Sequence, residues 1–197
     1  MTNEQGKKVA EQHRQMREGV ADAILAWASL ENGSVMLLAN LISDREDLHF
    51  ASAIYFAPTS IDVRTSILNR AFLARFNDEL QHRDFRELWG KLVKRIDGKR
   101  QKRNIIAHSG IATHFQNDEN HVRLMKPIWN SYELVPLSKS GQLPGMSAND
   151  VLQISKGIWD LAETLQMFTS AVRSFRIGGA QALSQACLQL KTRFSTE

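Results

Sequence analysis

Apolar residues recur every three or four positions along most of the chain, which is the spacing that gathers them on one face of an α-helix. These runs predict helices over about 20–43, 46–56, 60–76, 78–96, 147–175 and 180–192. A short continuation is expected toward His108 after an interruption at Asp97-Gly98, and Ser109-Gly110 then ends it. Only four prolines occur, so little else opposes helix formation.

The apolar face of each long helix is the expected core. In the first helix its members are Val20, Ile24, Trp27, Leu30, Leu37, Leu38 and Leu41. In the fourth and the penultimate helix they are Phe85, Leu88, Trp89, Leu92, Val93, Ile96, Val151, Ile154, Ile158, Leu161, Leu165, Phe168 and Val172. The remaining tryptophans, Trp129 and Trp159, also fit core positions, and Cys187 is expected to be a buried, unreactive thiol.

Two helix starts carry capping signals. Ser147 with Asp150 resembles a capping box at the start of the penultimate helix. Asn77 or Asp78 is expected to cap the fourth helix. Residues 1–15 are polar and lack an apolar pattern, so disorder is expected there.

The helical spacing of apolar residues stops in the middle of the chain. Apolar residues at 111–115 and 122–125 flank a polar run, which predicts a β-hairpin, and 128–135 is a possible third strand. The expected fold class is mainly α, an antiparallel helical bundle that forms a single domain over 1–197. The hairpin and its loop would form an insertion at about 111–144.

Composition narrows the function classes only slightly. The chain has 197 residues, a formal net charge of +4 and one cysteine, which excludes an internal disulfide framework and a multi-cysteine metal site. The start of the sequence lacks the apolar core of a signal peptide, and the longest apolar stretch, 35–42, is too short to span a bilayer. A cytoplasmic protein without membrane association is therefore expected. No cofactor is expected either, since Gly178-Gly179 lacks the context of a nucleotide-binding loop.

Positive charge is concentrated between residues 91 and 103, where seven basic residues are opposed only by Asp97. They are Lys91, Lys94, Arg95, Lys99, Arg100, Lys102 and Arg103. Such a run usually forms a solvated helix face. An unbroken helix would direct Arg103 along the apolar face, seven residues after Ile96. A break at Asp97-Gly98 would instead put Arg103 in the first turn of a new helix, where free N–H groups favour an anion.

Three residues at the end of this run could carry chemistry. Asn104 and His108 are four residues apart and share a helix face, and the long side chain of Arg103 can reach across. Together they supply a planar cation for phosphate oxygens, an orienting amide and an imidazole that can move protons near neutral pH. This is a minimal set of groups for phosphodiester cleavage without a metal ion.

A carboxylate interrupts the apolar stripe of the first helix at Glu31. Burying a carboxylate alone is costly, so Glu31 needs a cation or hydrogen-bond donors. Arg103, Arg64 and His108 are candidates, and Arg64 also falls on an inward-facing line. Two interpretations stay open: Glu31 is a catalytic residue beside the motif, or it forms a structural ion pair with Arg64.

The segment 103–108, Arg-Asn-Ile-Ile-Ala-His, resembles the Arg-x(4–6)-His motif of the HEPN superfamily, in which a polar residue commonly follows the arginine. The preceding sequence is also similar, from Trp27-Ala28-Ser29-Leu30-Glu31 through Ile54-Tyr55, Arg64 and Trp89. The similarity covers roughly residues 20–110.

This resemblance implies a metal-independent endoribonuclease in which the ribose 2′-hydroxyl attacks the adjacent phosphate. It implies that His108 transfers protons, Arg103 stabilises the developing negative charge and Asn104 orients one of them. The expected RNA-binding residues are Lys94, Arg95, Lys99, Arg100 and Lys102. The resemblance also implies a homodimer with a composite site and a role in phage defence, RNA processing or a toxin–antitoxin system, with an antitoxin or regulatory protein as a possible partner.

Two alternatives stay open for the function. The chain could be a non-catalytic HEPN-like module that binds RNA or protein, or a helical bundle without any nucleic-acid role. In the hairpin, His114 and His121 could bind a metal with Asp118 and Glu119, although surface histidines are the commoner case. Trp129 and Tyr132 could stack on bases, although packing is the commoner case.

Overall fold

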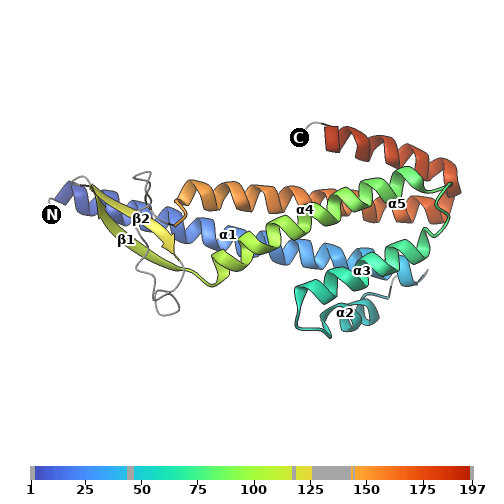
Figure 1. Cartoon of the computed structure of the whole chain (residues 1–197), viewed down its shortest axis with the longest axis horizontal. Coiled ribbons are helices and arrows are strands. Elements are labelled where there is room, and N and C mark those ends of the chain that lie inside the picture. The colour runs from blue at the N-terminus through green and yellow to red at the C-terminus, as the bar shows by residue number, and fades with distance from the viewer. Residues whose placement is uncertain (1–2, 44–46, 117–118, 126–142, 144, 196–197) are drawn as a thin grey trace. The chain divides into compact units, whose positions relative to one another are not determined.

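The computed structural model describes residues 3–43, 47–116, 119–125, 143 and 145–195. Its helices are α1 (Asn3–Ile42), α2 (Leu48–Phe56), α3 (Ile61–Arg75), α4 (Arg83–Ala107) and α5 (Ala148–Ser195) (Figure 1). Strands β1 (Gly110–Gln116) and β2 (Glu119–Met125) pair as an antiparallel hairpin. The mainly helical fold class with a small β-hairpin is therefore confirmed, whereas the possible strand at 128–135 lies outside the described residues.

The chain divides into two compact units. Unit 1 comprises Met1–Trp27 and Gly98–Ile158, and unit 2 comprises Ala28–Asp97 and Trp159–Glu197. Each unit thus combines segments that are far apart in the sequence, and α1, α4 and α5 contribute residues to both. The expectation of a single domain stays a prediction.

The first helix starts earlier than predicted. Helix α1 begins at Asn3, so the disorder expected for residues 1–15 is wrong for the described part of that segment. Polar side chains stabilise this first part of α1. The Arg14 guanidinium pairs with Glu11 at 2.5 Å and with Glu18 at 2.6 Å, three and four residues away. Such pairs stabilise a helix without any apolar repeat.

Helix α4 differs from the prediction at its start and in its middle. Asp78 does not cap α4 but closes a preceding turn, where its carboxylate accepts hydrogen bonds from the N–H groups of Leu80 and Gln81. The predicted interruption at Asp97-Gly98 is wrong, because the helix runs unbroken to Ala107. Gly98 is exposed, and a glycine inside a helix costs only about 1 kcal/mol, which burial of Leu92, Ile96 and Ile106 elsewhere in the helix can offset.

The core of unit 1 is built around small residues of α1. Its fully buried side chains include Met16, Ala23, Ala26, Trp27, Ile106, Leu124, Val151 and Ile158. A Cβ added to Gly19 would already contact Val151 at 3.4 Å, so α1 and α5 approach closely there. Of the predicted α1 stripe, Trp27, Leu30, Leu37, Leu38 and Leu41 are buried as expected. Val20 is half-buried, and Ile24, expected in the core, is 45% exposed.

The hairpin is joined to the start of α5 by a short bridge. Met146 and Leu124 exchange two backbone hydrogen bonds of 2.9 and 3.0 Å. Gly145 precedes this bridge with φ +80°, and a Cβ there would lie 2.6 Å from the carbonyl oxygen of Leu124. Only glycine suits both the left-handed backbone and the close approach.

The core of unit 2 is an aromatic cluster. Its rings belong to Phe72, Phe76, Phe85, Trp89, Phe168 and Phe175. Trp89 stacks on Phe72 at 4.4 Å between centroids, and its indole N–H donates to Asn69 Oδ1 at 2.8 Å. The predicted apolar faces of α4 and α5 are buried as expected, except for Val93, which is half-buried. Trp159 is 37% exposed, so its core assignment is wrong.

The end of α5 also follows the prediction. The backbone leaves the helical region at Gly179 (φ 61°, ψ −149°), which confirms the expected break at Gly178-Gly179. In the segment that follows, Lys191 pairs with Asp84 at 2.5 Å. Cys187 is buried, and its burial raises the pKa of the thiol, which fits the predicted unreactive cysteine.

Helix α1 is the one described helix that is long and apolar enough to cross a membrane by length and composition. Within its most apolar 18-residue window, 61% of the residues are buried inside the structure. A core helix passes the same test, so the expectation of no membrane association stays a prediction.

The predicted capping box at the start of α5 is confirmed. The Ser147 N–H and hydroxyl both donate to Asp150 Oδ2, at 2.8 and 2.7 Å, and the Asp150 N–H donates back to Ser147 Oγ at 3.2 Å. The hydrogen bonds from Ser147 lower the pKa of the Asp150 carboxyl below its ordinary value of 3.8.

We predict that Asp150→Asn lowers the free energy of unfolding by about 1 kcal/mol at neutral pH, because the carboxylate accepts both Ser147 bonds. A carboxyl with a lowered folded-state pKa stabilises above its unfolded-state pKa, and the contribution disappears as pH falls through the folded-state value. The difference between variant and wild type should therefore shrink below about pH 4. Urea unfolding of both proteins at neutral pH and below about pH 4 measures this difference. A difference that does not change with pH would contradict the role of the charge.

Candidate functional site

The Arg-Asn-…-His motif lies at the C-terminal end of α4, within unit 1. Because α4 is continuous, Arg103 falls seven residues after the buried Ile96 and is itself half-buried. The first of the two geometries left open by the sequence is thus the observed one. The anion site at a new helix start is excluded, since no helix starts there.

The guanidinium of Arg103 is held by neutral groups. It lies over the Trp27 ring, 5.8 Å from the ring centroid, and its Nη1 donates to Asn104 Oδ1 at 3.2 Å. Its Nε is buried without a hydrogen-bond partner, and no carboxylate of the described residues pairs with it. This cation therefore retains donors and an uncompensated charge that an anion could satisfy.

Asn104 and His108 are both exposed. His108 directly follows the last residue of α4, and its N–H donates to the Asn104 carbonyl at 3.1 Å, so the two side chains share one side of the helix end. The neighbouring Ile106 is fully buried and anchors this turn in the core of unit 1. No hydrogen bond joins the side chains of Arg103 and His108, although both residues are described.

The predicted RNA-binding cations have different surroundings. Lys94 and Lys102 are exposed, whereas Arg95 is half-buried with its guanidinium 4.6 Å from the centroid of the Phe194 ring. Lys99 and Arg100 are also half-buried, and the Lys99 ammonium lies where a Cβ on Gly157 would be, 2.2 Å from that position. Lys94 and Arg95 belong to unit 2, and the other three belong to unit 1.

The predicted ion pair of Glu31 is present in unit 2. Arg64 Nη1 donates to Glu31 Oε1 at 2.7 Å, and each side chain is only 17% exposed. Arg64 Nε also donates to the Pro58 carbonyl at 2.9 Å, and the guanidinium lies over the Phe56 ring. Of the partners considered for Glu31, the structure therefore shows Arg64, and this pair alone explains a carboxylate on the apolar stripe.

A catalytic role for Glu31 has no contact in its favour and stays a prediction. The charge of Glu31 contributes to raising the pKa of the nearby Tyr55 hydroxyl, although burial of that hydroxyl is the larger cause. The observed role of Glu31 is the ion pair with Arg64.

Sequence reasoning missed the part of α1 that contacts the hairpin. His13 Nε2 lies 3.0 Å from Thr113 Oγ1 of β1, and Gln12 Oε1 accepts a hydrogen bond from the Val122 N–H of β2 at 3.2 Å. Counting back from Trp27 in alternating steps of three and four passes Ile24 and Val20 and then reaches Arg17 and His13. Extending the predicted stripe toward the N-terminus would therefore have identified His13, but not Gln12.

The hairpin histidines lie opposite one another in the described part of β1 and β2. His114 and His121 face each other across the strand pair, and His114 Nε2 contacts Met125 Sδ. Asp118 lies outside the described residues. Among the residues that are described, no group of three His, Cys, Asp or Glu side chains is arranged to hold a metal ion.

No protein-family model matches the chain, no curated protein is similar to it, and no solved structure matches its fold. The resemblance to the HEPN superfamily therefore depends on the motif and on the helices that precede it.

We predict that Glu31→Gln lowers the free energy of unfolding by about 1–3 kcal/mol, because Arg64 would keep its charge in a mostly buried place without a counter-ion. Urea unfolding followed by circular dichroism measures this loss. The matched control is Glu87→Gln, which removes the partner of Arg83 in an exposed pair and should cost less than about 0.5 kcal/mol. Equal losses for both variants would contradict the structural role of the Glu31–Arg64 pair.

Proposed function

We propose that this chain is a HEPN-type endoribonuclease that cleaves RNA phosphodiesters without using a metal ion. One observation supports the proposal most: Arg103, Asn104 and His108 all lie at the C-terminal end of α4, with the imidazole and the amide exposed and the guanidinium unpaired with any described carboxylate. An arginine without a carboxylate partner and an exposed histidine on the same helix end suit a phosphate with a neighbouring hydroxyl.

In the proposed reaction, His108 takes the proton of a ribose 2′-hydroxyl. The 2′-oxygen attacks the adjacent phosphorus, and the bond from phosphorus to the 5′-oxygen of the next nucleotide breaks. The leaving oxygen takes a proton, so the products are a 2′,3′-cyclic phosphate and a 5′-hydroxyl. Proton transfer by a positioned imidazole contributes typically about 10²–10⁴-fold to such a rate.

Arg103 stabilises the extra negative charge that develops on the phosphate oxygens. Its guanidinium is held between the Trp27 ring and the Asn104 amide, so little reorientation is needed when the charge develops. Asn104 positions the guanidinium through the hydrogen bond to its Oδ1. The exposed Lys102 contributes to binding the RNA backbone.

The resemblance supports two further parts of the proposal. A homodimer would bring two copies of the motif together, so that His108 of one copy accepts the proton and His108 of the other donates one. The cellular role would be in phage defence, RNA processing or a toxin–antitoxin system in the cytoplasm, with an antitoxin or regulatory protein as a partner.

A second candidate function is a non-catalytic HEPN-like module that binds RNA or protein. It is favoured by the position of Arg103, which stacks over Trp27 and shares no hydrogen bond with His108. The same contact could serve packing alone. The two candidate functions differ in whether RNA is cut.

We predict that the purified chain cuts labelled RNA in the presence of EDTA and leaves 2′,3′-cyclic phosphate ends. His108→Ala should lower the rate by at least about 100-fold, because it removes the proton-transferring group. The matched control is His49→Ala, which removes an exposed histidine of α2 and should leave the rate unchanged. Gel analysis of the cleavage products and their end groups measures both effects.

Binding without cleavage would favour the non-catalytic module, particularly if affinity fell steeply with salt. Absence of RNA affinity at low salt would contradict both candidate functions. Cleavage that survives in His108→Ala would contradict the role of the imidazole.

We also predict that Arg103→Lys lowers the cleavage rate by about 100-fold, although the charge is kept, because lysine loses the planar fork that grips phosphate oxygens. Single-turnover cleavage at saturating protein measures this loss. The reciprocal control is Lys102→Arg at the exposed neighbouring position, for which we expect no loss. Unchanged activity of Arg103→Lys would exclude a bidentate grip on the phosphate.

A further inference from the structure

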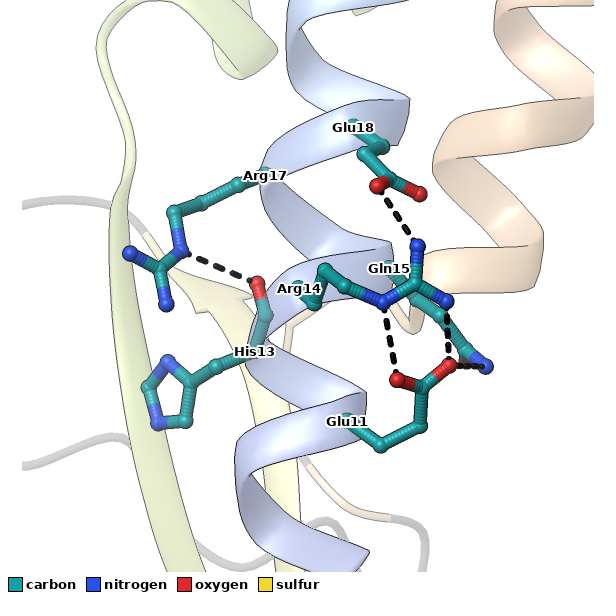
Figure 2. A network of polar contacts seen from close by, with 6 residues as sticks. All are labelled: Glu11, His13, Arg14, Gln15, Arg17 and Glu18. Carbon is teal, nitrogen blue, oxygen red and sulfur yellow. Dashed lines mark hydrogen bonds and ion pairs between the residues drawn. The ribbon is translucent and has the colours of Figure 1, made fainter.

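Unit 1 carries a second arginine–histidine pair, on α1. Arg17 and His13 are four residues apart, and Arg17 Nε donates to the His13 carbonyl at 3.3 Å. Figure 2 shows their side chains on one side of the helix, whereas Arg14, Glu11 and Glu18 lie on the other. The Arg17 side chain is exposed, its Nε donates to the His13 carbonyl, and its terminal nitrogens donate to no described residue.

Two contacts of α1 show where Arg17 lies relative to the motif and the hairpin of unit 1. At one end Trp27 lies under the Arg103 guanidinium, and at the other end His13 lies against Thr113 of β1. These two points of α1 are separated by about 21 Å of helix axis, at about 1.5 Å per residue. Arg17 lies between them, on the same stripe, next to the half-buried Val20. A row on α1 thus leads from the motif to the hairpin.

Charge distinguishes Arg17 from its neighbour Arg14. The Arg14 guanidinium is neutralised by two carboxylates, those of Glu11 and Glu18, and this pairing lowers the pKa of the Glu11 carboxyl to about 2. No carboxylate of the described residues pairs with Arg17, whose observed hydrogen bond is to a neutral carbonyl. Two arginines on the same turn of helix therefore differ in how much charge they offer an anion.

We propose that Arg17 binds a backbone phosphate of a single-stranded RNA, with His13 fixing this part of α1 against β1. The proposal rests on the proposed function, because it extends the RNA path from the motif along α1 toward the hairpin. A guanidinium suits this role because its planar donors match two phosphate oxygens at once. Arg17 is a positioning residue, so it contributes to affinity and not to bond cleavage.

The test compares Arg17→Ala with Arg14→Ala, a matched pair of exposed arginines on one helix turn. Binding is measured by fluorescence anisotropy with a labelled RNA that carries 2′-O-methyl groups and is not cut. Arg17→Ala should weaken binding by about fivefold or more at low salt and reduce the slope of log affinity against log salt by about 1. Arg14→Ala should change the affinity by less than about twofold, and Arg17→Lys should retain part of it.

Equal effects of Arg17→Ala and Arg14→Ala would overturn the inference. Thermal unfolding of each variant checks that the helix is intact. Cleavage assays separate this proposal from the nuclease proposal, since Arg17→Ala should raise KM and leave kcat unchanged. If the wild type cleaves RNA and Arg17→Ala binds it normally, the phosphate site is rejected and the nuclease proposal is kept. Selective loss of binding in Arg17→Ala without any cleavage by the wild type would support the site and remove the nuclease.

Discussion

The candidate site depends on α4 remaining helical through Asp97 and Gly98 to its last turn. This continuity turns Arg103 toward the buried side of the helix, where its guanidinium meets the Trp27 ring. The same helical geometry turns Asn104 and His108 toward solvent. The end of α4 therefore carries a partly covered cation and two exposed polar groups. A break at Gly98 would uncouple the motif from the apolar face that orients it.

Ion pairing separates cations that hold the fold from cations that are available to a ligand. Arg64 is matched by Glu31 on a mostly buried surface, and Arg14 is matched by carboxylates of its own helix. Arg103 and Arg17 contact neutral groups instead, an amide and an indole ring in one case and a carbonyl in the other. Both lie in unit 1. Whether a cation is available to a ligand thus depends on its own ion pairing more than on the net charge of the chain.

Short-range signals predicted most of the secondary structure. The capping box at Ser147 and Asp150 and the buried stripes of α4 and α5 depend on residues a few positions apart, and the hairpin pairs two consecutive strands. The start of α1 was missed because polar pairs and not apolar repeats stabilise it. The predicted stripe of α1 was wrong only near its start, where Ile24 is exposed and α1 approaches α5 closely at Gly19.

The sequence alone determined the helical class, the hairpin and the shared side of Asn104 and His108, because a spacing of four residues has one meaning within a helix. Only the tertiary structure decided that Glu31 pairs with Arg64, that Trp27 covers Arg103 and that Arg17 stays exposed. These outcomes join residues far apart in the chain. They follow from how closely the helices of each unit pack, which depends on side-chain shapes and volumes that no periodic pattern encodes.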